Sequence, residues 1–140
     1  RGYAVLIEHG IETARKFAVE IEKKGNFRLV TYPELNILTY QVCPEYLAQM
    51  LLEKNSEKVI SAYEKLNKIN RTVQRIQREK GKGFVSRTTL RTTNSWGRDM
   101  VVLRAVIANP MTNMQILKEV LNEQEEIYRA VSPQFELNSN

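Results

Sequence analysis

The spacing of apolar and polar residues divides the chain into helical and extended stretches. Between residues 4 and 25 apolar side chains recur every three or four positions, charged side chains fall between them, and Gly25 ends the pattern. This pattern predicts one amphipathic helix. The same spacing predicts a longer helix from Ser56 to the glycines at 81 and 83. Its apolar stripe consists of Val59, Tyr63, Leu66, Ile69, Val73 and Ile76.

Four other stretches are rich in β-branched and aromatic residues, which is typical of strands. Pro33 separates the first two, Pro44 ends the second, and a polar loop with a glycine joins the last two. Two pairs of strands are therefore predicted, and Pro44 opens a short helix over 44–54. The four predicted strands are 27–33, 36–44, 84–91 and 100–108.

The last helix is predicted from a capping box, because Thr112 and Gln115 fit the pattern Thr-x-x-Gln in front of apolar residues between 116 and 128. The tail 132–140 has no period and is expected to fray. The predicted order is helix, two strands, one or two helices, two strands and helix. Such segregated elements indicate an α+β domain of two layers, in which a small, largely antiparallel sheet packs against helices.

Composition agrees with one globular domain. The 140 residues are 42% hydrophobic and 26% charged, and no apolar run approaches the roughly 18 residues of a membrane span. The net charge of +5 comes from basic residues interleaved with acidic ones, as on a solvated surface. Cys43 is the only cysteine, so a reducing compartment, the cytoplasm, is expected. Because the sequence starts at Arg1 without an initiator methionine, we expect a segment of a larger protein.

Neither His9 nor Cys43 has the neighbours that catalysis or metal binding requires. His9 is the only histidine, and the chain has no second cysteine, so neither a zinc site nor a nucleophile with its base can be completed. We interpret His9 as a surface residue of the first helix and Cys43 as a small buried apolar side chain. We assign no catalytic and no metal-binding residue.

The stretch KGKGFVSR at 80–87 partly matches an RNA-binding signature, K/R-G-F/Y-G/A-F-V-x-F/Y. Lys82 and Arg87 occupy two of the places where aromatic rings would stack on bases, so we expect no nucleic-acid partner. A basic nucleic-acid-binding module is kept as an alternative. It requires a single exposed stripe made of Lys80, Lys82, Arg87 and Arg91.

Arg104 is the one charged residue of the apolar stretch VVLRAVIANP at 101–110. A guanidinium keeps its charge, so in an apolar strand it needs water or an anionic partner. Strand alternation places it with Val102 and Val106, on the face opposite Leu103. Two interpretations are open: its head group pairs with an internal glutamate, or it binds the carboxylate or phosphate of a ligand.

Three stretches, taken in order, resemble the small domain of the group II pyridoxal-phosphate-dependent amino-acid decarboxylases. They are GYAVLIEHGIETARKFAVEIEKKGNFRLV, PELNILTYQVCP, and LRAVIANPMT followed by an amphipathic helix. The resemblance covers residues 2 to about 130. FVSRTTL, ahead of the third stretch, is most similar to the bacterial branch that acts on aspartate or glutamate.

The resemblance implies that residues 1–140 are the C-terminal small domain of a fold-type I enzyme that removes the α-carboxylate of an amino acid. In the glutamate-decarboxylase branch the arginine that matches Arg104 binds the substrate α-carboxylate. Its grip favours decarboxylation by orienting the substrate. Pyridoxal phosphate serves such enzymes as an electron sink.

The resemblance also implies what lies elsewhere. The family's cofactor lysine follows a histidine in the large domain, whereas His9 precedes Gly10. We therefore expect the chain alone to be inactive, with the large domain of the same chain as its partner and a homodimer as the assembly. The remaining alternative, a non-catalytic dimerisation domain, requires a self-complementary apolar face and no concave site at Arg104.

Overall fold

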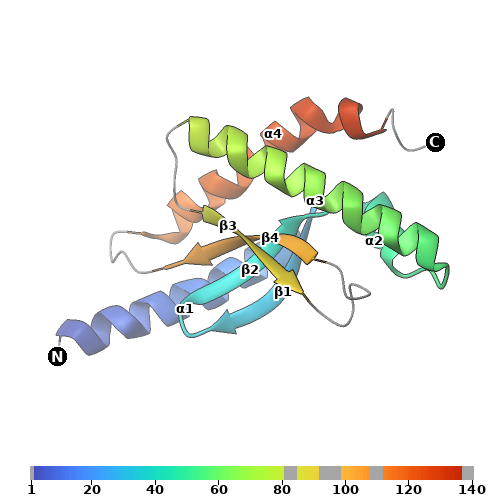
Figure 1. The fold of residues 1–140 in the computed structure, drawn as a ribbon. Coiled ribbons are helices and arrows are strands. Elements are labelled where there is room, and N and C mark those ends of the chain that lie inside the picture. Colours follow the sequence, from blue (N-terminus) through green and yellow to red (C-terminus); the bar gives the residue numbers. More distant parts are fainter. Residues whose placement is uncertain (1, 81–84, 92–98, 108–111, 137–140) are drawn as a thin grey trace.

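The computed structural model describes residues 2–80, 85–91, 99–107 and 112–136, which form helices around a four-stranded sheet (Figure 1). Its elements follow the predicted order and confirm the predicted α+β class, an antiparallel sheet packed against helices. They are α1 (Gly2–Lys23), β1 (Phe27–Glu34), β2 (Ile37–Val42), α2 (Glu45–Leu51), α3 (Ser56–Glu79), β3 (Val85–Arg91), β4 (Asp99–Val106) and α4 (Met114–Glu136).

The sheet joins the two predicted strand pairs through their second strands. Its order is β1-β2-β4-β3, and every neighbouring pair is antiparallel. Pro33 lies inside β1 and does not end it, contrary to the prediction. A proline is tolerated there because β1 is an edge strand, whose outer side needs no N–H for the ladder. The centre of the sheet is therefore formed by β2 and β4.

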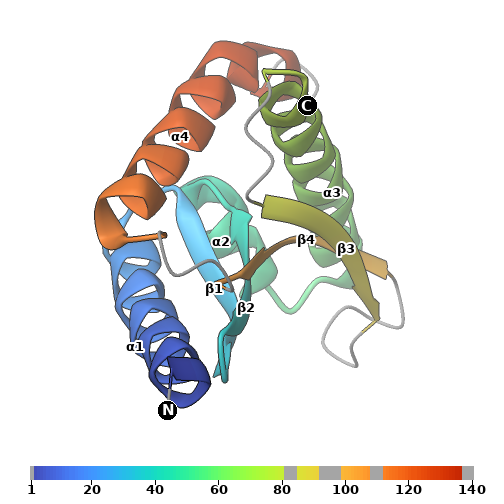
Figure 2. The same cartoon turned by 90° about the vertical axis from the view of Figure 1, so that its left-hand side faces the viewer.

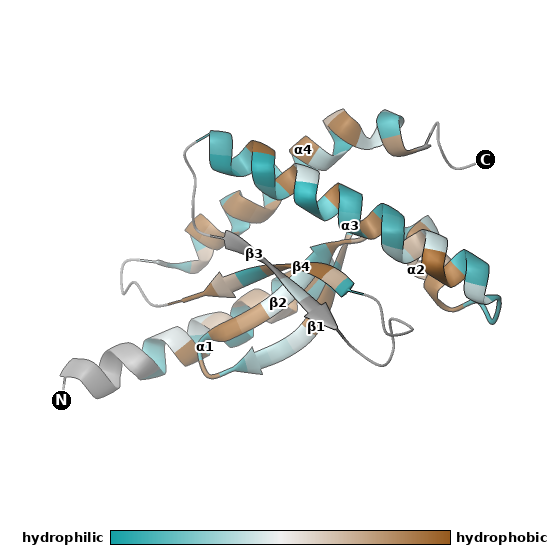
Figure 3. Ribbon diagram, in the orientation of Figure 1, coloured by the Kyte–Doolittle hydropathy of each residue, from teal (hydrophilic) through white to brown (hydrophobic). Residues whose placement is uncertain are grey.

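One core lies between the first face of the sheet and the helices α1, α3 and α4 (Figure 2). In that view α4 runs across the top, from α1 to the carboxyl-terminal end of α3. Figure 3 shows apolar residues along β4 and a hydrophilic outer face on α3. The predicted stripe of α3 is confirmed, since all its residues pack in the core or against it. The largest buried side chains of the whole core include Phe17, Leu38, Tyr40, Leu66, Ile69, Leu103 and Leu121.

The second face of the sheet is covered by described side chains at one end only. Val59 and Tyr63, near the start of α3, pack on Met100 and Val102. Further along β4, the next residue on this face is Arg104, and it is exposed. The covered end anchors β4, and the open end gives solvent access to the middle of a central strand.

The start of α4 differs from the prediction. The predicted cap, Thr112, is buried and lies two residues before the helix. Asn113 caps it instead, because its Oδ1 accepts a hydrogen bond from the backbone N–H of Ile116 at 3.0 Å. The capping-box prediction was therefore wrong by one residue, although the helix itself is present.

The carboxyl-terminal part of α4 also differs, since the helix includes Pro133 and runs to Glu136. A proline inside a helix leaves the carbonyl four residues earlier without its N–H donor. Here Ser132 Oγ donates to that carbonyl, the Arg129 oxygen, at 3.1 Å, and Phe135 packs against the core. The predicted fraying is thus wrong for 132–136, and 137–140 lie outside the described residues.

Candidate functional site

Arg104 lies in β4, one of the two strands with a partner on each side. The register places it opposite Thr39 of β2 and Ser86 of β3. Leu103 and Ala105, its neighbours in the chain, are buried in the core, whereas Arg104 is exposed on the opposite face. The strand alternation predicted from the sequence is confirmed.

No ion pair or hydrogen bond joins the Arg104 side chain to another described side chain. The hydroxyl of Thr39, directly opposite, is engaged with the Thr31 hydroxyl at 2.8 Å. Within the part of the chain described, the internal-glutamate interpretation therefore finds no partner. The guanidinium faces water, where an anionic ligand can reach it.

Arg28 is also an arginine in an apolar strand, but its head group has partners inside the protein. Its Nη2 donates to Gln41 Oε1 at 2.9 Å and lies 3.5 Å from the sulfur of Met100. Gln41 is fully buried and itself donates to the carbonyl of Val101 at 2.9 Å. Arg28 is thus held by internal, neutral partners, although its Nε is buried without a partner among the described atoms. Arg28 was not predicted as a candidate, although FRLV, like LRAV, places one arginine among apolar residues.

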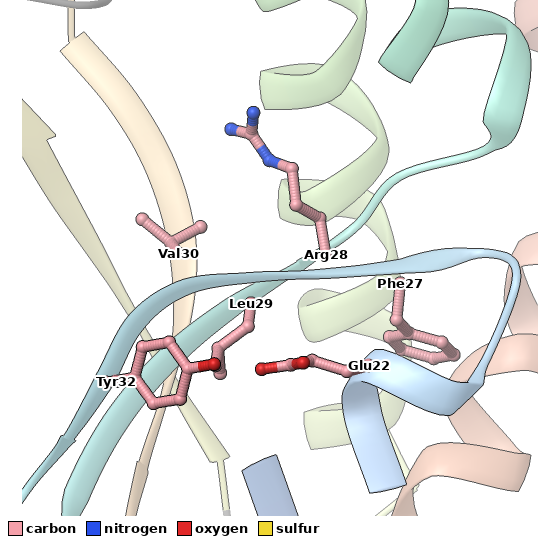
Figure 4. A pocket seen from close by; sticks show the side chains of 6 residues that line it. All are labelled: Glu22, Phe27, Arg28, Leu29, Val30 and Tyr32. Carbon is pink, nitrogen blue, oxygen red and sulfur yellow. The ribbon is translucent and has the colours of Figure 1, made fainter. Parts of the chain in front are cut away.

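A hollow of about 420 Å³ lies along β1, and Arg104 is not among the residues that line it (Figure 4). In Figure 4 the side chains of Arg28 and Val30 point to one side of β1, while Tyr32 lies near the Glu22 carboxylate on the other. The hydrogen bond to Glu22 is the main cause that raises the pKa of Tyr32 above its ordinary value. The hollow is therefore a feature of the sheet edge, separate from the candidate residue.

His9 and Cys43 occupy the kinds of position that the sequence predicted. His9 is exposed on α1, and its Nε2 lies 3.3 Å from the carbonyl oxygen of Thr112. Cys43 is a buried free cysteine. Burial raises the pKa of its thiol, and the positive charge of Arg28 opposes this shift. Cys43 is held in its unreactive, protonated form.

The basic stripe of the nucleic-acid alternative cannot be assembled from the described side chains. Lys82 and the side chains of Arg87 and Arg91 lie outside them, and Lys80 is exposed at the end of α3. Among the described residues, no group of three or more His, Cys, Asp or Glu side chains could hold a metal ion. No helix in this part of the chain is both long enough and apolar enough to cross a membrane.

Comparison with known proteins gives one curated relative with a clear sequence match. The chain is 42% identical over 126 residues to a protein of Aliivibrio fischeri named Aspartate 1-decarboxylase. The match covers 90% of this chain but only 23% of the relative. No family model matches the chain.

Solved structures share the fold at low sequence identity. One is the glutamate decarboxylase domain of a diaminobutyrate-pyruvate transaminase and L-2,4-diaminobutyrate decarboxylase from Vibrio parahaemolyticus. Its TM-score is 0.63 at 14% identity, over 87% of this chain and 21% of that one. The fold thus occurs in an amino-acid decarboxylase. Oryza sativa TDC, solved with PLP and tryptamine, has a TM-score of 0.64 at 13% identity, over 90% of this chain and 23% of that one.

Proposed function

We propose that residues 1–140 form the C-terminal domain of a pyridoxal-phosphate-dependent enzyme that removes the α-carboxylate of an amino acid. Aspartate is the first substrate we propose, and glutamate is the second. The observation that carries this proposal is the 42% identity, over 126 residues, with a protein named Aspartate 1-decarboxylase. The shared fold and the order of the three resembling stretches support it. Because the chain spans 23% of that relative, the remaining parts of the enzyme are assigned to chain outside this segment.

Within this proposal Arg104 binds the α-carboxylate of the substrate. Its planar guanidinium offers two parallel N–H donors, which match the two oxygens of a carboxylate. The carboxylate loses its charge as carbon dioxide departs, so an interaction with that charge does not favour the transition state over bound substrate. The arginine therefore contributes by orienting the bond that breaks.

The hollow at β1 does not fit pyridoxal phosphate. No lysine lines the hollow at β1, and the chain contains no histidine followed by lysine. We therefore assign the cofactor to the rest of the enzyme and expect residues 1–140 alone to be inactive.

The open end of the second sheet face is the surface we assign to the rest of the chain. Val106 is exposed beside Arg104 on β4, and Leu35 is exposed at the turn between β1 and β2. A contact with the rest of the chain would cover these two apolar side chains. A homodimeric assembly and a cytoplasmic location belong to the same proposal.

The full-length protein tests the proposal directly. With pyridoxal phosphate present, it is expected to release carbon dioxide from L-aspartate and form β-alanine, the product of α-decarboxylation. L-Glutamate is the second substrate to try, and L-tryptophan is the control for an unrelated side chain. Formation of alanine, a preference for L-tryptophan, or no cofactor-dependent release from either acidic amino acid would contradict the proposal.

A further inference from the structure

The end of β4 is fastened by Asn36, in the turn between β1 and β2. The backbone N–H of Ile107 donates to the Asn36 carbonyl at 2.9 Å. In the opposite direction, Asn36 Nδ2 donates to the Ile107 carbonyl at 3.1 Å. Both polar groups of the residue that follows β4 are thereby paired with one asparagine. The fastening lies just beyond the last β2–β4 register pair, Ile37 with Val106.

Helix α1 packs against Ile107 and Asn36 at the same place. A Cβ at Gly10 would lie 2.7 Å from the Ile107 carbonyl oxygen and 3.3 Å from Asn36 Cβ. A larger side chain at Gly10 would therefore push α1 away from the end of β4. One residue earlier, the contact of His9 with the Thr112 carbonyl holds α1 to the chain that enters α4. Three segments distant in the sequence therefore meet where β4 ends.

The start of β4 is held in a matching way, but with more support. Asn67 of α3 accepts from the Val101 N–H at 2.8 Å and donates to the Asp99 carbonyl at 3.0 Å. Gln41 bonds the Val101 carbonyl, and the neighbouring Met100 and Val102 are buried. The end of β4 lacks this packing on the second face, since Val106 is 38% exposed. Its position depends more strongly on Asn36.

We infer that Asn36, backed by Gly10, is a positioning residue for Arg104. The inference rests on the proposed role of Arg104 as the carboxylate-binding residue. Because Arg104 has no described side-chain partner, the backbone of β4 alone sets the position of its side chain. Misplacement of a binding group by about 1 Å can cost roughly a hundred-fold in rate, so a fastening near Arg104 affects substrate binding without touching the substrate.

The test uses the full-length enzyme with two ligands that differ in one group. L-Aspartate carries the α-carboxylate, and β-alanine is the same molecule without it. For Asn36→Ala we expect KM for L-aspartate to rise roughly ten-fold, while the inhibition constant of β-alanine changes less than about two-fold. Arg104→Lys should show the same selective change, and a larger one.

Asn67→Ala is the matched control, because it removes two hydrogen bonds from the opposite end of the same strand. It should lower the melting temperature at least as much as Asn36→Ala and leave both constants unchanged. If Asn36→Ala does not fold, Asn36→Ser, which also removes the amide donor and adds no charge, takes its place.

Three results would overturn the inference: an unchanged KM in the Asn36 variant, an equal rise of both constants, or the same selective rise in Asn67→Ala. Failure of the proposed function is distinguishable, since the unsubstituted enzyme would then not convert L-aspartate. An unchanged KM in Arg104→Lys would instead contradict the assigned role of Arg104. A selective effect of Arg104→Lys without one of Asn36→Ala would contradict the positioning role alone.

Discussion

Tyr40 is a fully buried residue whose only polar atom is satisfied inside the core. Its O–H donates to Gln124 Oε1 at 2.8 Å, and Gln124 Nε2 donates to Gln77 Oε1 at 2.9 Å. This network connects β2 with α4 and α3. Burial raises the pKa of Tyr40 well above its ordinary value, because the phenolate would lose its hydration, and the hydrogen bond to Gln124 offsets this only in part.

Replacing Tyr40 by phenylalanine should destabilise the fold by about 1 to 3 kcal/mol at pH 8, because it leaves a buried amide oxygen unpaired. The folded-state pKa is raised, so the wild type loses stability as the pH rises above about 10, where the unfolded tyrosine ionises. Tyr40→Phe lacks this loss. In urea unfolding, the wild type should exceed Tyr40→Phe in free energy of unfolding by less at about pH 10.5 than at pH 8. An equal difference at the two pH values would contradict the burial of Tyr40 as a neutral side chain.

Arg28 and Arg104 illustrate what can be predicted for single residues. Strand alternation correctly placed Arg104 opposite the core face. It could not tell which arginine has an internal partner, because the two partners of Arg28, Gln41 and Met100, lie 13 and 72 residues away in the sequence. Such partners follow from the fold, which local patterns do not encode.

At the scale of elements, α1 packs at Gly10 against the residue that follows β4. A helix interior normally gains about 1 kcal/mol when alanine replaces glycine. At Gly10 the new Cβ would lie 2.7 Å from a backbone carbonyl oxygen, which cannot rotate away. The steric contact therefore outweighs the helix propensity.

We expect Gly10→Ala to lower the free energy of unfolding by about 1 to 3 kcal/mol, the range for overpacked sites. Gly25→Ala is the control, since a Cβ there meets nothing within 4 Å, and it should change stability by less than about 0.5 kcal/mol. Chemical unfolding of both variants measures this. Equal stabilities would mean that α1 does not press on the end of β4.

A second prediction at this scale concerns the packing of α3. Leu66 is fully buried in the middle of its apolar stripe, so Leu66→Ala should cost about 2 to 5 kcal/mol. Lys68→Ala, two residues along on the exposed face, should stay within about 0.5 kcal/mol. Denaturant melts that fail to separate the two variants would contradict the two-layer packing.

Periodicity predicted every helix and strand that the structure describes, but it was less reliable at their ends. The start of α4 was assigned to Thr112 because a local motif fits there, and Asn113 supplies the cap instead. The end was placed before Ser132 because the tail has no period, yet the helix continues through Pro133, where the Ser132 hydroxyl replaces the missing bond. Both endings depend on individual hydrogen bonds that composition does not reveal.

At the scale of the whole molecule, the sequence predicted the two strand pairs but not the pairing of β2 with β4 that joins them. That pairing places Thr39 beside Arg104 and brings Asn36 to the end of β4. Contacts of this range arise when the helices close one core over both pairs. The site proposed here therefore depends on the tertiary structure more than on any motif.

The proposal that the cofactor lysine lies outside residues 1–140 can be tested on these residues alone. Residues 1–140, mixed with pyridoxal phosphate and dialysed, should fold and remain colourless, because we assign the cofactor lysine to another part of the enzyme. Far-ultraviolet circular dichroism and a visible spectrum record both properties. A visible band that survives dialysis and disappears on substitution of one lysine would place that lysine in this segment.

Arg104→Lys in the full-length enzyme tests the central claim most directly. Lysine keeps the charge but loses the planar pair of donors. Arg28→Lys is the matched control, because Arg28 is bound internally and its replacement should lower stability without changing kinetics.

Steady-state kinetics with L-aspartate and a thermal melt on the same preparation give the answer. Loss of charge-assisted hydrogen bonds worth about 1.5 to 3 kcal/mol should lower kcat/KM of Arg104→Lys roughly ten- to a hundred-fold, with little change in Tm. A lower Tm with unaltered kcat/KM would contradict the assignment of Arg104 to the substrate carboxylate.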